Sequence, residues 1–301
     1  MATELIAVGT ALVAASANLR KAGSLSPRLD AEVLLAHHLG RDRTWLLAHP
    51  EEPIREADAF GALVARRANG EPVAYIRGYK EWHSLRIRTD ERALIPRPET
   101  ELLLDVAVQE IEARLTRLRG PNAVVAWEVA TGSGAVTVAL ARHFAAATAA
   151  RRLRLIASDL STDALALATE NLAEQGVSES VELVRADLLA PAGEAMPRPD
   201  VVVANLPYVA SAEVDARQGS LGFEPRIALD GGPDGLDLLR ALLASLPTRA
   251  APSATAILEL GAGQVDAVRS IAPSGASVIV VPDMAGIERV VRIGMADFGR
   301  D

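Results

Sequence analysis

The stretch A-W-E-V-A-T-G-S-G-A-V, residues 126–136, decides how the rest of this chain is interpreted. A run of strand-forming residues enters a turn with two glycines, Gly132 and Gly134, and a helical pattern follows. Glycine permits the tight turn and lets backbone N–H groups approach a ligand where the helix starts. Val138 stands where the dinucleotide fingerprint has its third glycine, so a pyrophosphate is not the obvious ligand. The segment predicts a strand–turn–helix unit with a candidate cofactor loop.

Apolar runs and helical patterns alternate along the chain around this unit. The strand-like runs lie at 123–129, 153–158, 181–185, 200–205, 254–260, 277–282 and 288–294. Helical patterns fall between most of them, at 135–147, 162–175, 234–246 and 263–272. This alternation predicts an α/β fold with an open, doubly wound, mostly parallel sheet. Only Asp283 to Ile287 separate the last two runs, too few for a parallel crossover, so we expect seven strands that end in an antiparallel edge hairpin.

The first 80 residues contain helical patterns only. An apolar stripe runs from Leu5 to Leu19, Ser26-Pro27 opens a second helix, and residues 56–68 form a third. We therefore expect a small all-helical domain over residues 1–80, a β-hairpin linker over 81–96 with its turn at Thr89-Asp90, and the α/β domain over 97–301. The helical domain is interpreted as a recognition module for a substrate, with a merely structural cap as the alternative.

Composition excludes several classes of protein. Half of the 301 residues are hydrophobic and 23% are charged, so the chain can bury a large core and is not a disordered polymer. The lack of cysteine excludes disulfides, thiolate zinc sites and cysteine nucleophiles. No run of 18 uncharged apolar residues occurs, and Glu4 precedes the first basic residue, Arg20, which is the wrong order for a secretory signal peptide. We expect a cytoplasmic protein with no membrane partner.

Charge is distributed unevenly. Residues 1–80 hold ten Lys and Arg against nine Asp and Glu, whereas the remaining residues hold 21 against 30, a net charge of −9. Proteins that grip nucleic acid usually present a basic face, because phosphate neutralisation supplies most of their affinity. No direct nucleic-acid partner is therefore expected, although a local basic patch is compatible with an acidic total.

A carboxylate follows the second strand-like run. Ser158-Asp159 ends that run, which places Asp159 at the carboxyl edge of the strand beside the glycine loop. A carboxylate there suits hydrogen bonds to the two hydroxyls of a ribose. The alternative role, a cap for the helix that begins at 162, is already offered by the side chain of Ser161. Loop and acid together favour a nucleoside cofactor.

The fourth run ends in Asn205-Leu206-Pro207-Tyr208. Asn205 and the Leu206 carbonyl offer two adjacent acceptors, proline fixes the backbone, and Tyr208 can cover a planar group. This arrangement suits a planar NH₂ group, either a carboxamide or the exocyclic amine of a base. An ordinary strand-to-loop turn is the alternative.

Other candidates for chemistry are weaker. Glu99 and Glu101 lie two residues apart at the start of a helix, so they do not face each other as an acid–base pair. The histidines show no ligand spacing, so no metal is expected. Neither G-x-S-x-G nor G-x-x-x-x-G-K occurs, which leaves hydrolase and P-loop functions without support.

Several motifs together resemble one family. G-S-G after the first strand with N-x-P-Y after the fourth is typical of methyltransferases that use S-adenosylmethionine and methylate amino nitrogens. L-I-P-R-P-E-T-E at 94–101 is more specific and looks like the signature of the release-factor glutamine methyltransferases, the HemK/PrmC family. The segments 223–236, 259–264 and 283–291 are similar to that family too. The resemblance covers essentially the whole chain, including the helical N-terminal domain.

The resemblance implies a function and a set of site residues. It implies a seven-stranded methyltransferase sheet, S-adenosyl-L-methionine as the methyl donor, and the glutamine of the Gly-Gly-Gln loop of peptide chain release factors as the acceptor. The reaction would be a direct displacement at the sulfonium methyl. The implied catalytic residues are Asn205, Leu206, Pro207 and Tyr208. Those implied to hold the cofactor are Ala130, Thr131, Gly132, Ser133, Gly134, Asp159, Leu188 and Asn205. Those implied to position the substrate are Arg97, Pro98 and Glu99.

The chain departs from the family pattern at two places. Leucine replaces the usual proline at position 206, and Glu128-Val129-Ala130 replaces aspartate-leucine followed by glycine or cysteine. Leucine keeps the backbone acceptor and glutamate keeps the charge, so the mechanism stays intact. Asn-Leu-Pro-Tyr is, however, also the form in ribosomal-RNA adenine dimethyltransferases. An adenine amino-group methyltransferase acting on ribosomal RNA or DNA is thus the alternative, and a catalytically silent binding module is the third hypothesis.

Overall fold

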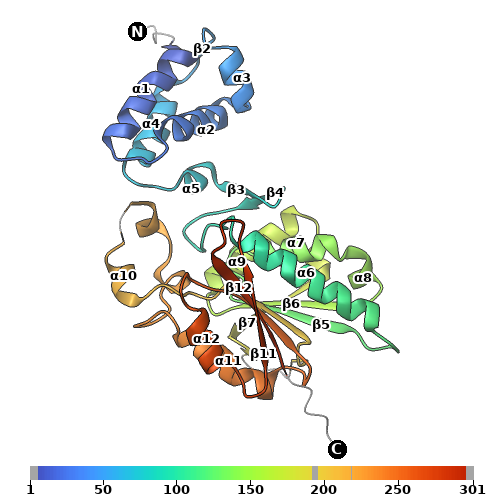
Figure 1. Ribbon diagram of the computed structural model, residues 1–301. Coiled ribbons are helices and arrows are strands. Elements are labelled where there is room, and N and C mark those ends of the chain that lie inside the picture. The colour runs from blue at the N-terminus through green and yellow to red at the C-terminus, as the bar shows by residue number, and fades with distance from the viewer. Residues whose placement is uncertain (1–5, 192–195, 218, 296–301) are drawn as a thin grey trace, which may run out of the picture. The chain divides into compact units, whose positions relative to one another are not determined.

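The predicted strand-like runs of the α/β region form a single twisted sheet (Figure 1). Five strands pair in parallel in the order β10-β9-β5-β6-β7, and the β11–β12 hairpin adds to the β10 side with β12 innermost. The strands are β5 (Val124–Val129), β6 (Leu153–Asp159), β7 (Val181–Asp187), β9 (Val201–Ala204), β10 (Thr255–Glu259), β11 (Ser277–Pro282) and β12 (Glu288–Gly294). The predicted seven-stranded doubly wound sheet with an antiparallel edge is confirmed. A two-residue strand, β8 (Ala190–Pro191), extends the opposite edge.

The structure, a computed structural model, describes residues 6–191, 196–217 and 219–295. The chain divides into two compact units. The first comprises the residues up to Lys80 together with Arg217–Phe223, and the second comprises Glu81–Ala216 together with the chain from Glu224 onward. The sheet belongs to the second unit. Among the described residues, no helix has both the length and the apolar character needed to cross a bilayer.

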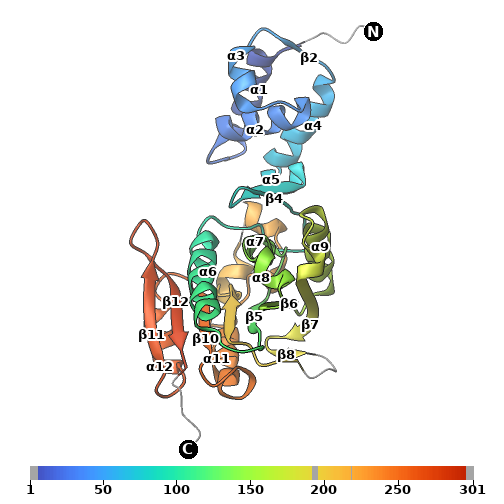
Figure 2. The same cartoon turned by 90° about the vertical axis from the view of Figure 1, so that its right-hand side faces the viewer.

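Helices cover both faces of the sheet (Figure 2). On one face, buried side chains of α6, α7 and α9 pack against inward-facing residues such as Val201 and Val203. On the other face, α11 and α12 pack against the alternate residues Val202 and Ala204, as the two-residue period of a strand requires. The helices of this unit are α6 (Thr100–Arg117), α7 (Ala135–His143), α8 (Ala145–Ala149), α9 (Thr162–Glu174), α10 (Ser211–Asp215), α11 (Asp237–Arg249) and α12 (Val265–Ile271).

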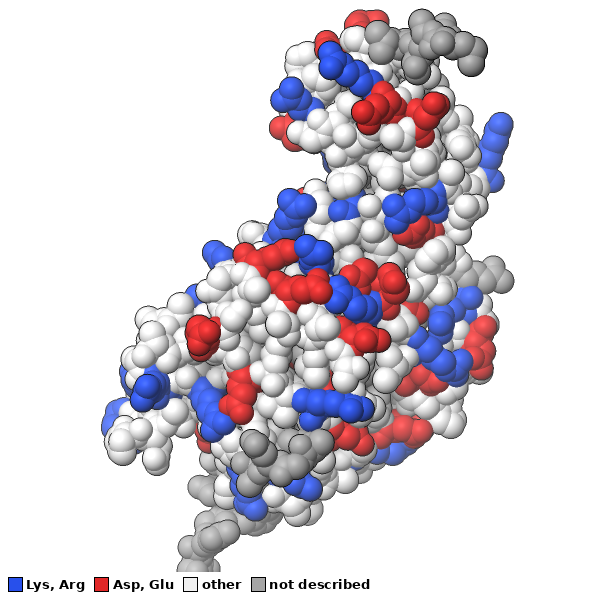
Figure 3. All heavy atoms as spheres, turned by 180° about the vertical axis from the view of Figure 1, so that it is seen from behind, with Lys and Arg blue, Asp and Glu red and all other residues white. Residues whose placement is uncertain are grey.

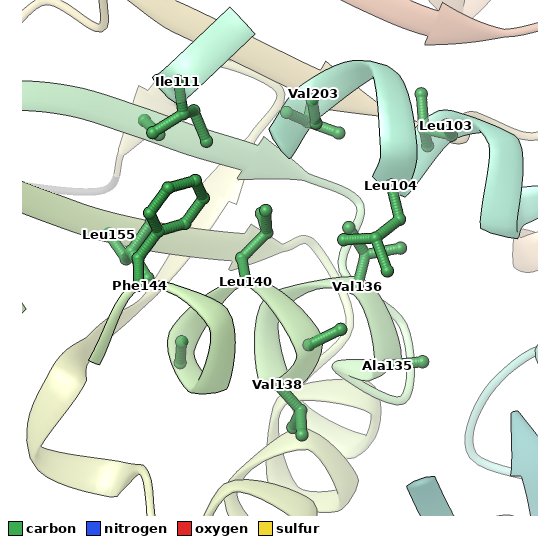
Figure 4. Close-up of a cluster of buried hydrophobic side chains, with 14 of the residues drawn as sticks. Leu103, Leu104, Ile111, Ala135, Val136, Val138, Leu140, Phe144, Leu155 and Val203 are labelled. Carbon is green, nitrogen blue, oxygen red and sulfur yellow. The ribbon is translucent and has the colours of Figure 1, made fainter. Parts of the chain in front are cut away.

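Aliphatic side chains fill the first of these two cores. Figure 4 shows Leu104 and Ile111 of α6 packed with Val136 and Leu140 of α7 on the same face of the sheet. Phe144 closes the end of this layer, at the point where the predicted helix 135–147 breaks into α7 and α8. The core fixes α7 against the sheet, and it thereby fixes the turn that leads from β5 into α7.

The first unit is a bundle of short helices, and the helical prediction for it is confirmed. The helices are α1 (Val8–Lys21), α2 (Pro27–Leu39), α3 (Arg43–Ala48), α4 (Ala57–Ala68) and α5 (Val73–Arg77). One exception is a short pairing of β1 (Ile6–Ala7) with β2 (Pro53–Ile54). Within the unit, Arg67 donates from Nη1 to Ser220 Oγ at 2.9 Å. This contact helps to group Arg217–Phe223 with the helices, although the segment lies far from them in the sequence.

A hairpin follows the bundle, but its turn is not where the sequence placed it. Strands β3 (Tyr79–Trp82) and β4 (Leu85–Arg88) are joined by His83 and Ser84, with φ of 47° and 59°. Two positive φ angles define the turn that best matches the twist of a two-residue hairpin. The hairpin turn predicted at Thr89-Asp90 is misplaced, because these residues follow β4 instead of joining it to β3. Asp90 accepts a hydrogen bond from the Arg92 backbone N–H at 3.1 Å, in a separate turn after the hairpin.

The turn between β5 and α7 leaves little space for a side chain at Gly134. Its φ is +78°, and a Cβ there would lie 3.0 Å from the Cβ and 3.2 Å from the Cα of Ala168 in α9. Gly176 has a similar φ of +69°, and a Cβ there would have nothing within 4 Å. The two glycines therefore separate the cost of backbone strain from the cost of a clash.

We expect Gly134→Ala to lower the free energy of unfolding by about 2–4 kcal/mol, because left-handed strain adds to overpacking against α9. Gly176→Ala is the matched control and should cost only the strain, about 1–2 kcal/mol. Urea denaturation followed by circular dichroism measures both values. Equal losses in the two variants would mean that α9 yields to the new methyl group and that the close packing is not required.

Candidate active site

The carboxyl ends of β5, β6 and β9 open onto a cavity of about 580 Å³ within the second unit. This volume is in the range that holds a small-molecule ligand. The predicted site residues that line the cavity are Ala130, Thr131, Gly132, Ser133, Asp159, Leu188, Asn205, Leu206, Pro207 and Arg97. Gly134, Pro98, Glu99 and Tyr208 lie outside its lining. Parallel strands bring these segments together because their carboxyl ends share one edge of the sheet.

Hydrogen bonds from the end of β6 hold the glycine loop. The backbone N–H of Thr131 donates to the Ser158 carbonyl at 2.9 Å, and that of Gly132 donates to Asp159 Oδ2 at 2.9 Å. Ala130, Gly132 and Gly134 all have positive φ, at 56°, 55° and 78°. Alanine adopts this conformation at an energetic cost where the family pattern favours glycine or cysteine, so Ala130 is a point of stored backbone strain.

Asp159 lines the cavity and also supports the backbone. Its Oδ2 accepts from Gly132, and its Oδ1 accepts from the Ser161 N–H at 2.9 Å. The Ser161 side chain caps α9 by accepting from the Ala164 N–H at 3.2 Å, as the sequence predicted. Burial raises the pKa of Asp159, and its backbone donors partly offset that shift. A carboxylate has about four acceptor sites, and backbone N–H groups of Gly132 and Ser161 take two of them here.

Glu128 belongs to the site, although in the sequence it stands out only as a departure from the family pattern. It is buried at the end of β5 and lines the cavity. It accepts a hydrogen bond from Thr131 Oγ1 at 2.8 Å and another from Thr137 Oγ1 of α7. Burial raises its pKa to about 7, and the two hydroxyls oppose the shift. The carboxylate therefore ties the loop to the first turn of α7.

Two glycine-containing segments hold the backbone after β9. The carbonyl oxygens of Pro207 and Tyr208 lie against Gly231 and Gly235, and a Cβ on Gly231 would lie 2.6 Å from the Pro207 oxygen. Gln264 donates from Nε2 to the Tyr208 carbonyl at 3.1 Å and accepts from the Gly261 N–H at 2.9 Å. Segments 223–236 and 259–264, which carry part of the family resemblance, therefore lie against the Asn-Leu-Pro-Tyr turn. They fix the loop that presents Asn205.

An ion pair joins two of the family segments. Glu224 is 2% exposed, accepts from the Ile95 N–H at 3.1 Å and pairs with the Arg97 guanidinium. The Arg97 carbonyl accepts from Trp82 Nε1 at 2.8 Å. Pro98 and Glu99 are exposed beyond this clamp. Arg97 thus lines the cavity with its positive charge balanced by Glu224. The two residues are too far apart in the sequence for this pairing to be predicted from it.

The Asn205 amide is held by a residue that sequence reasoning missed. Asn205 donates from Nδ2 to Thr100 Oγ1 at 3.1 Å, and Thr100 is the first residue of α6 and lines the cavity. Glu259, the last residue of β10, is 1% exposed, and burial raises its pKa to about 7, with Thr100 and Asn205 opposing the rise. An acid that ends an apolar strand, the same pattern as at Asp159, could have indicated Glu259 from the sequence.

The cationic groups at the cavity are neutralised by carboxylates. Arg92 pairs with Asp90 at 2.7 Å and Glu170 at 2.7 Å, and Arg226 pairs with Asp230 at 2.8 Å. On the face seen in Figure 3, basic and acidic side chains of the second unit are interspersed. Within the described ranges, no group of three His, Cys, Asp or Glu side chains is placed to hold a metal ion.

The fold and site together define a class of protein: an α/β enzyme scaffold with a glycine loop, an acid after the neighbouring strand and an Asn-x-Pro-Tyr turn at one cavity. The chain is similar in fold to the crystal structure of the hMettl16 catalytic domain in complex with MAT2A 3′UTR hairpin 6. The TM-score is 0.51 with 13% sequence identity, covering 79% of this chain and 84% of the other. At that identity the likeness concerns the fold alone.

Sequence relatives identify the family. Residues 10–78 match the PrmC N-terminal domain family. The chain is 36% identical over 285 residues to the release factor glutamine methyltransferase of Rhodopirellula baltica, covering 92% of each chain. It is 37% identical to that of Moorella thermoacetica, covering 93% of this chain and 95% of the relative. The chain belongs to the release factor glutamine methyltransferase family.

The raised pKa of Glu128 makes stability depend on pH. The folded state holds the proton up to about pH 7, whereas the ordinary pKa of an exposed glutamate is 4.5, so stability is lost as the pH rises from 4.5 through 7. Between pH 6 and pH 8.5 we expect the parent to lose about 1.4 kcal/mol of stability relative to Glu128→Gln. Over this range Glu128 is already ionised in the unfolded state, whereas in the folded state it keeps its proton for about the first pH unit, and one pH unit corresponds to about 1.4 kcal/mol. Urea denaturation at both pH values tests this, with Glu182→Gln on the protein surface as the control. A difference between parent and variant that stays constant with pH would place the pKa of Glu128 near its ordinary value.

Proposed function

We propose that this protein transfers a methyl group from S-adenosyl-L-methionine to the side-chain amide nitrogen of the glutamine in the Gly-Gly-Gln motif of peptide chain release factors. The observation that carries the proposal is the position of Asn205 and Leu206 at the cavity that also holds the glycine loop and Asp159. Family membership supports the same reaction, because the relatives are named release factor glutamine methyltransferases.

The cavity residues fit the proposed methyl donor. In the proposal, residues 130–134 and the backbone at Leu188 hold its amino-acid part and base, and Asp159 accepts from the ribose hydroxyls with the acceptor directions that Gly132 and Ser161 leave open. When bound, S-adenosylmethionine supplies a methyl group on a positively charged sulfur, which a nucleophilic nitrogen takes by direct displacement. Burial of Asp159 strengthens its hydrogen bonds to such hydroxyls.

The Asn-Leu-Pro-Tyr turn would bind and orient the acceptor. A carboxamide nitrogen is a poor nucleophile, because its lone pair is delocalised into the carbonyl. The oxygen of Asn205 and the Leu206 carbonyl each accept one N–H of the substrate amide, which directs the lone pair toward the methyl and favours a nitrogen that gains positive charge. Pro207 stiffens the turn and Tyr208 covers the flat amide. The nitrogen loses its proton after the transfer.

The remaining parts of the chain have proposed roles as well. Residues 1–80 would recognise the release factor, residues 81–96 would act as the linker, and residues 97–301 would hold the methyl donor and carry out catalysis. Arg97, Pro98 and Glu99 would position the substrate, with Arg97 fixed by Glu224. The proposal includes a cytoplasmic location and no nucleic-acid, membrane or metal partner.

The Asn-Leu-Pro-Tyr form favours one other candidate, an adenine amino-group methyltransferase acting on ribosomal RNA or DNA. The ion pairs of Arg92 and Arg226 at the cavity count against it, because paired arginines have less charge to offer phosphates. Incubation with labelled methyl donor and either release factor or ribosomal RNA separates the two candidates. Label on RNA alone would overturn the proposed function.

We expect Asp159→Ala to weaken binding of S-adenosylmethionine, because it removes charge-assisted hydrogen bonds, worth about 1.5–3 kcal/mol each, and the acceptor that holds Gly132. Asp163→Ala, an exposed acid in the first turn of the following helix, is the matched control and should bind as the parent does. Calorimetry measures both affinities. Equal affinities in parent and Asp159→Ala would remove Asp159 from the site.

Asn205→Ala should lower the methylation rate by about 10²–10³, because one preorganised acceptor is lost and the glutamine becomes free to rotate. Donor affinity should fall much less, since Asp159 and the glycine loop remain. Leu206→Pro is the companion variant and should keep the parent rate, because the acceptor there is a backbone carbonyl. Single-turnover measurements at saturating donor give both rates. An Asn205→Ala enzyme within a few-fold of the parent would refute the role of Asn205.

A further inference from the structure

A buried carboxylate lies next to the Asn205 amide without being part of the cavity. Glu259 ends β10, which pairs directly with β9, the strand that leads to Asn205. It is 1% exposed and is not among the residues that line the cavity. Its Oε2 atom has no hydrogen-bond partner among the described residues. A buried, unsatisfied carboxylate oxygen costs free energy, so its presence beside the site calls for a physical reason.

The hydroxyl of Thr100 connects this carboxylate to Asn205. Thr100 Oγ1 accepts from Asn205 Nδ2 at 3.1 Å. Glu259 lies beside Asn205, because Leu258 and Ala204, the residues before them, are register partners in the parallel pair of β10 and β9. The Thr100 and Asn205 side chains both oppose the rise in the pKa of Glu259. A hydroxyl has a single proton to donate. While Thr100 Oγ1 accepts from Asn205, the hydroxyl proton of Thr100 is free to be donated to a second acceptor next to Thr100. An ionised carboxylate only accepts hydrogen bonds, and Glu259 is the carboxylate in place.

We propose that Glu259 is a positioning residue that takes the hydroxyl proton of Thr100 in a hydrogen bond and thereby sets which end of the Asn205 amide faces the cavity. The order of donors is Asn205 Nδ2 to Thr100 Oγ1, and Thr100 Oγ1 to the Glu259 carboxylate. With Nδ2 engaged in this direction, the Oδ1 atom of Asn205 is left for the cavity. The inference deepens the proposed function, on which its kinetic part rests.

The polarity of this chain of hydrogen bonds decides what the site can accept. In the stated order, Asn205 presents an acceptor, which matches an amide N–H of the substrate. In the reverse order, a protonated Glu259 donates to Thr100, Thr100 donates to Asn205 Oδ1, and the Asn205 NH₂ faces the cavity. The N–H groups of Asn205 and of the substrate amide then point at each other with no acceptor between them, so an amide substrate would be rejected. The charge on Glu259 therefore acts as a determinant of specificity for NH₂-bearing substrates.

The charged groups around Glu259 set the pH at which the order reverses. Burial raises the pKa of Glu259 to about 7, the nearby Glu99 adds to the rise, and Arg289 on the strand next to β10 opposes it. Tyr208 also faces Glu259, and its own pKa is raised by burial and by that carboxylate. The carboxylate form prevails above about pH 7, so kcat/KM should rise between pH 6 and pH 8.

Three variants of the full-length protein test the chain of hydrogen bonds. Thr100→Val removes the hydroxyl at nearly constant volume, whereas Thr100→Ser keeps it and is the matched control. At pH 8 we expect a loss of about tenfold or more in kcat for Thr100→Val and a rate near the parent for Thr100→Ser, because one charge-assisted interaction is lost only in the former. Glu259→Gln should lower kcat about tenfold as well and should abolish the rise between pH 6 and pH 8. Calorimetric affinity for S-adenosylmethionine should change much less than kcat in Thr100→Val and Glu259→Gln.

A spectroscopic measurement tests the same chain without any turnover. In the parent, the side-chain NH₂ resonances of Asn205, assigned by their loss in Asn205→Ser, should shift with pH and report a midpoint near 7. The shift should be absent in Glu259→Gln and in Thr100→Val. Circular dichroism and thermal melts establish that each variant is folded before it is compared.

Two outcomes would overturn the inference. One is an Asn205 NH₂ resonance that does not respond to pH in the folded parent, and the other is a Thr100→Val enzyme as active as Thr100→Ser. Failure of the proposed function is distinguishable from both. A parent that does not methylate release factor removes the assigned reaction, whereas the resonance measurement still decides whether Glu259 and Thr100 orient Asn205.

Discussion

The hydrogen bond from the Gly132 N–H to Asp159 joins the turn after β5 to the end of β6, and the geometry of the cavity depends on it. The turn has three residues in the left-handed region, one of them Ala130, and such a conformation persists only where its surroundings enforce it. Glu128 supplies a second restraint through Thr131 and Thr137. Together these two acids fix the backbone of the turn at the rim of the cavity while α7 stays packed on the sheet.

Buried acidic residues at or next to the carboxyl ends of strands occur three times in and around this site. Glu128 lies at the end of β5, Asp159 ends β6 and Glu259 ends β10, and burial raises the pKa of all three. Keeping carboxylates in a buried position costs stability near neutral pH. In the proposed function, this cost falls at the edge of the sheet where acceptors serve ribose hydroxyls, loop N–H groups and the orientation of Asn205. Stability comes instead from the aliphatic cores on the two faces of the sheet.

The segments that carry the family resemblance are neighbours in the structure, and they hold the turn after β9 in place. Residues 94–101 and 223–236 meet through the Arg97–Glu224 pair, and Gln264 fastens the Tyr208 carbonyl to the segment that contains Gly235. Gly231 and Gly235 admit no side chain, because the Pro207 and Tyr208 carbonyls occupy that space. The turn after Leu206, where the family pattern has proline, is thus fixed from outside by its neighbours.

The sequence by itself determined the order of chemical features along the chain: the parallel sheet with its antiparallel hairpin, the glycine loop, Asp159 and the Asn205 turn. These features follow from local patterns, because strand periodicity, glycine in tight turns and polar residues at strand ends act over a few residues. Only the tertiary structure decided that Thr100 accepts from Asn205, that Glu224 neutralises Arg97 and that residues 217–223 group with the helical bundle. The structure also places the hairpin turn at His83-Ser84, whereas the sequence predicted it at Thr89-Asp90. Such contacts join residues as many as 153 positions apart, and their energy comes from burial and pairing that no local pattern encodes.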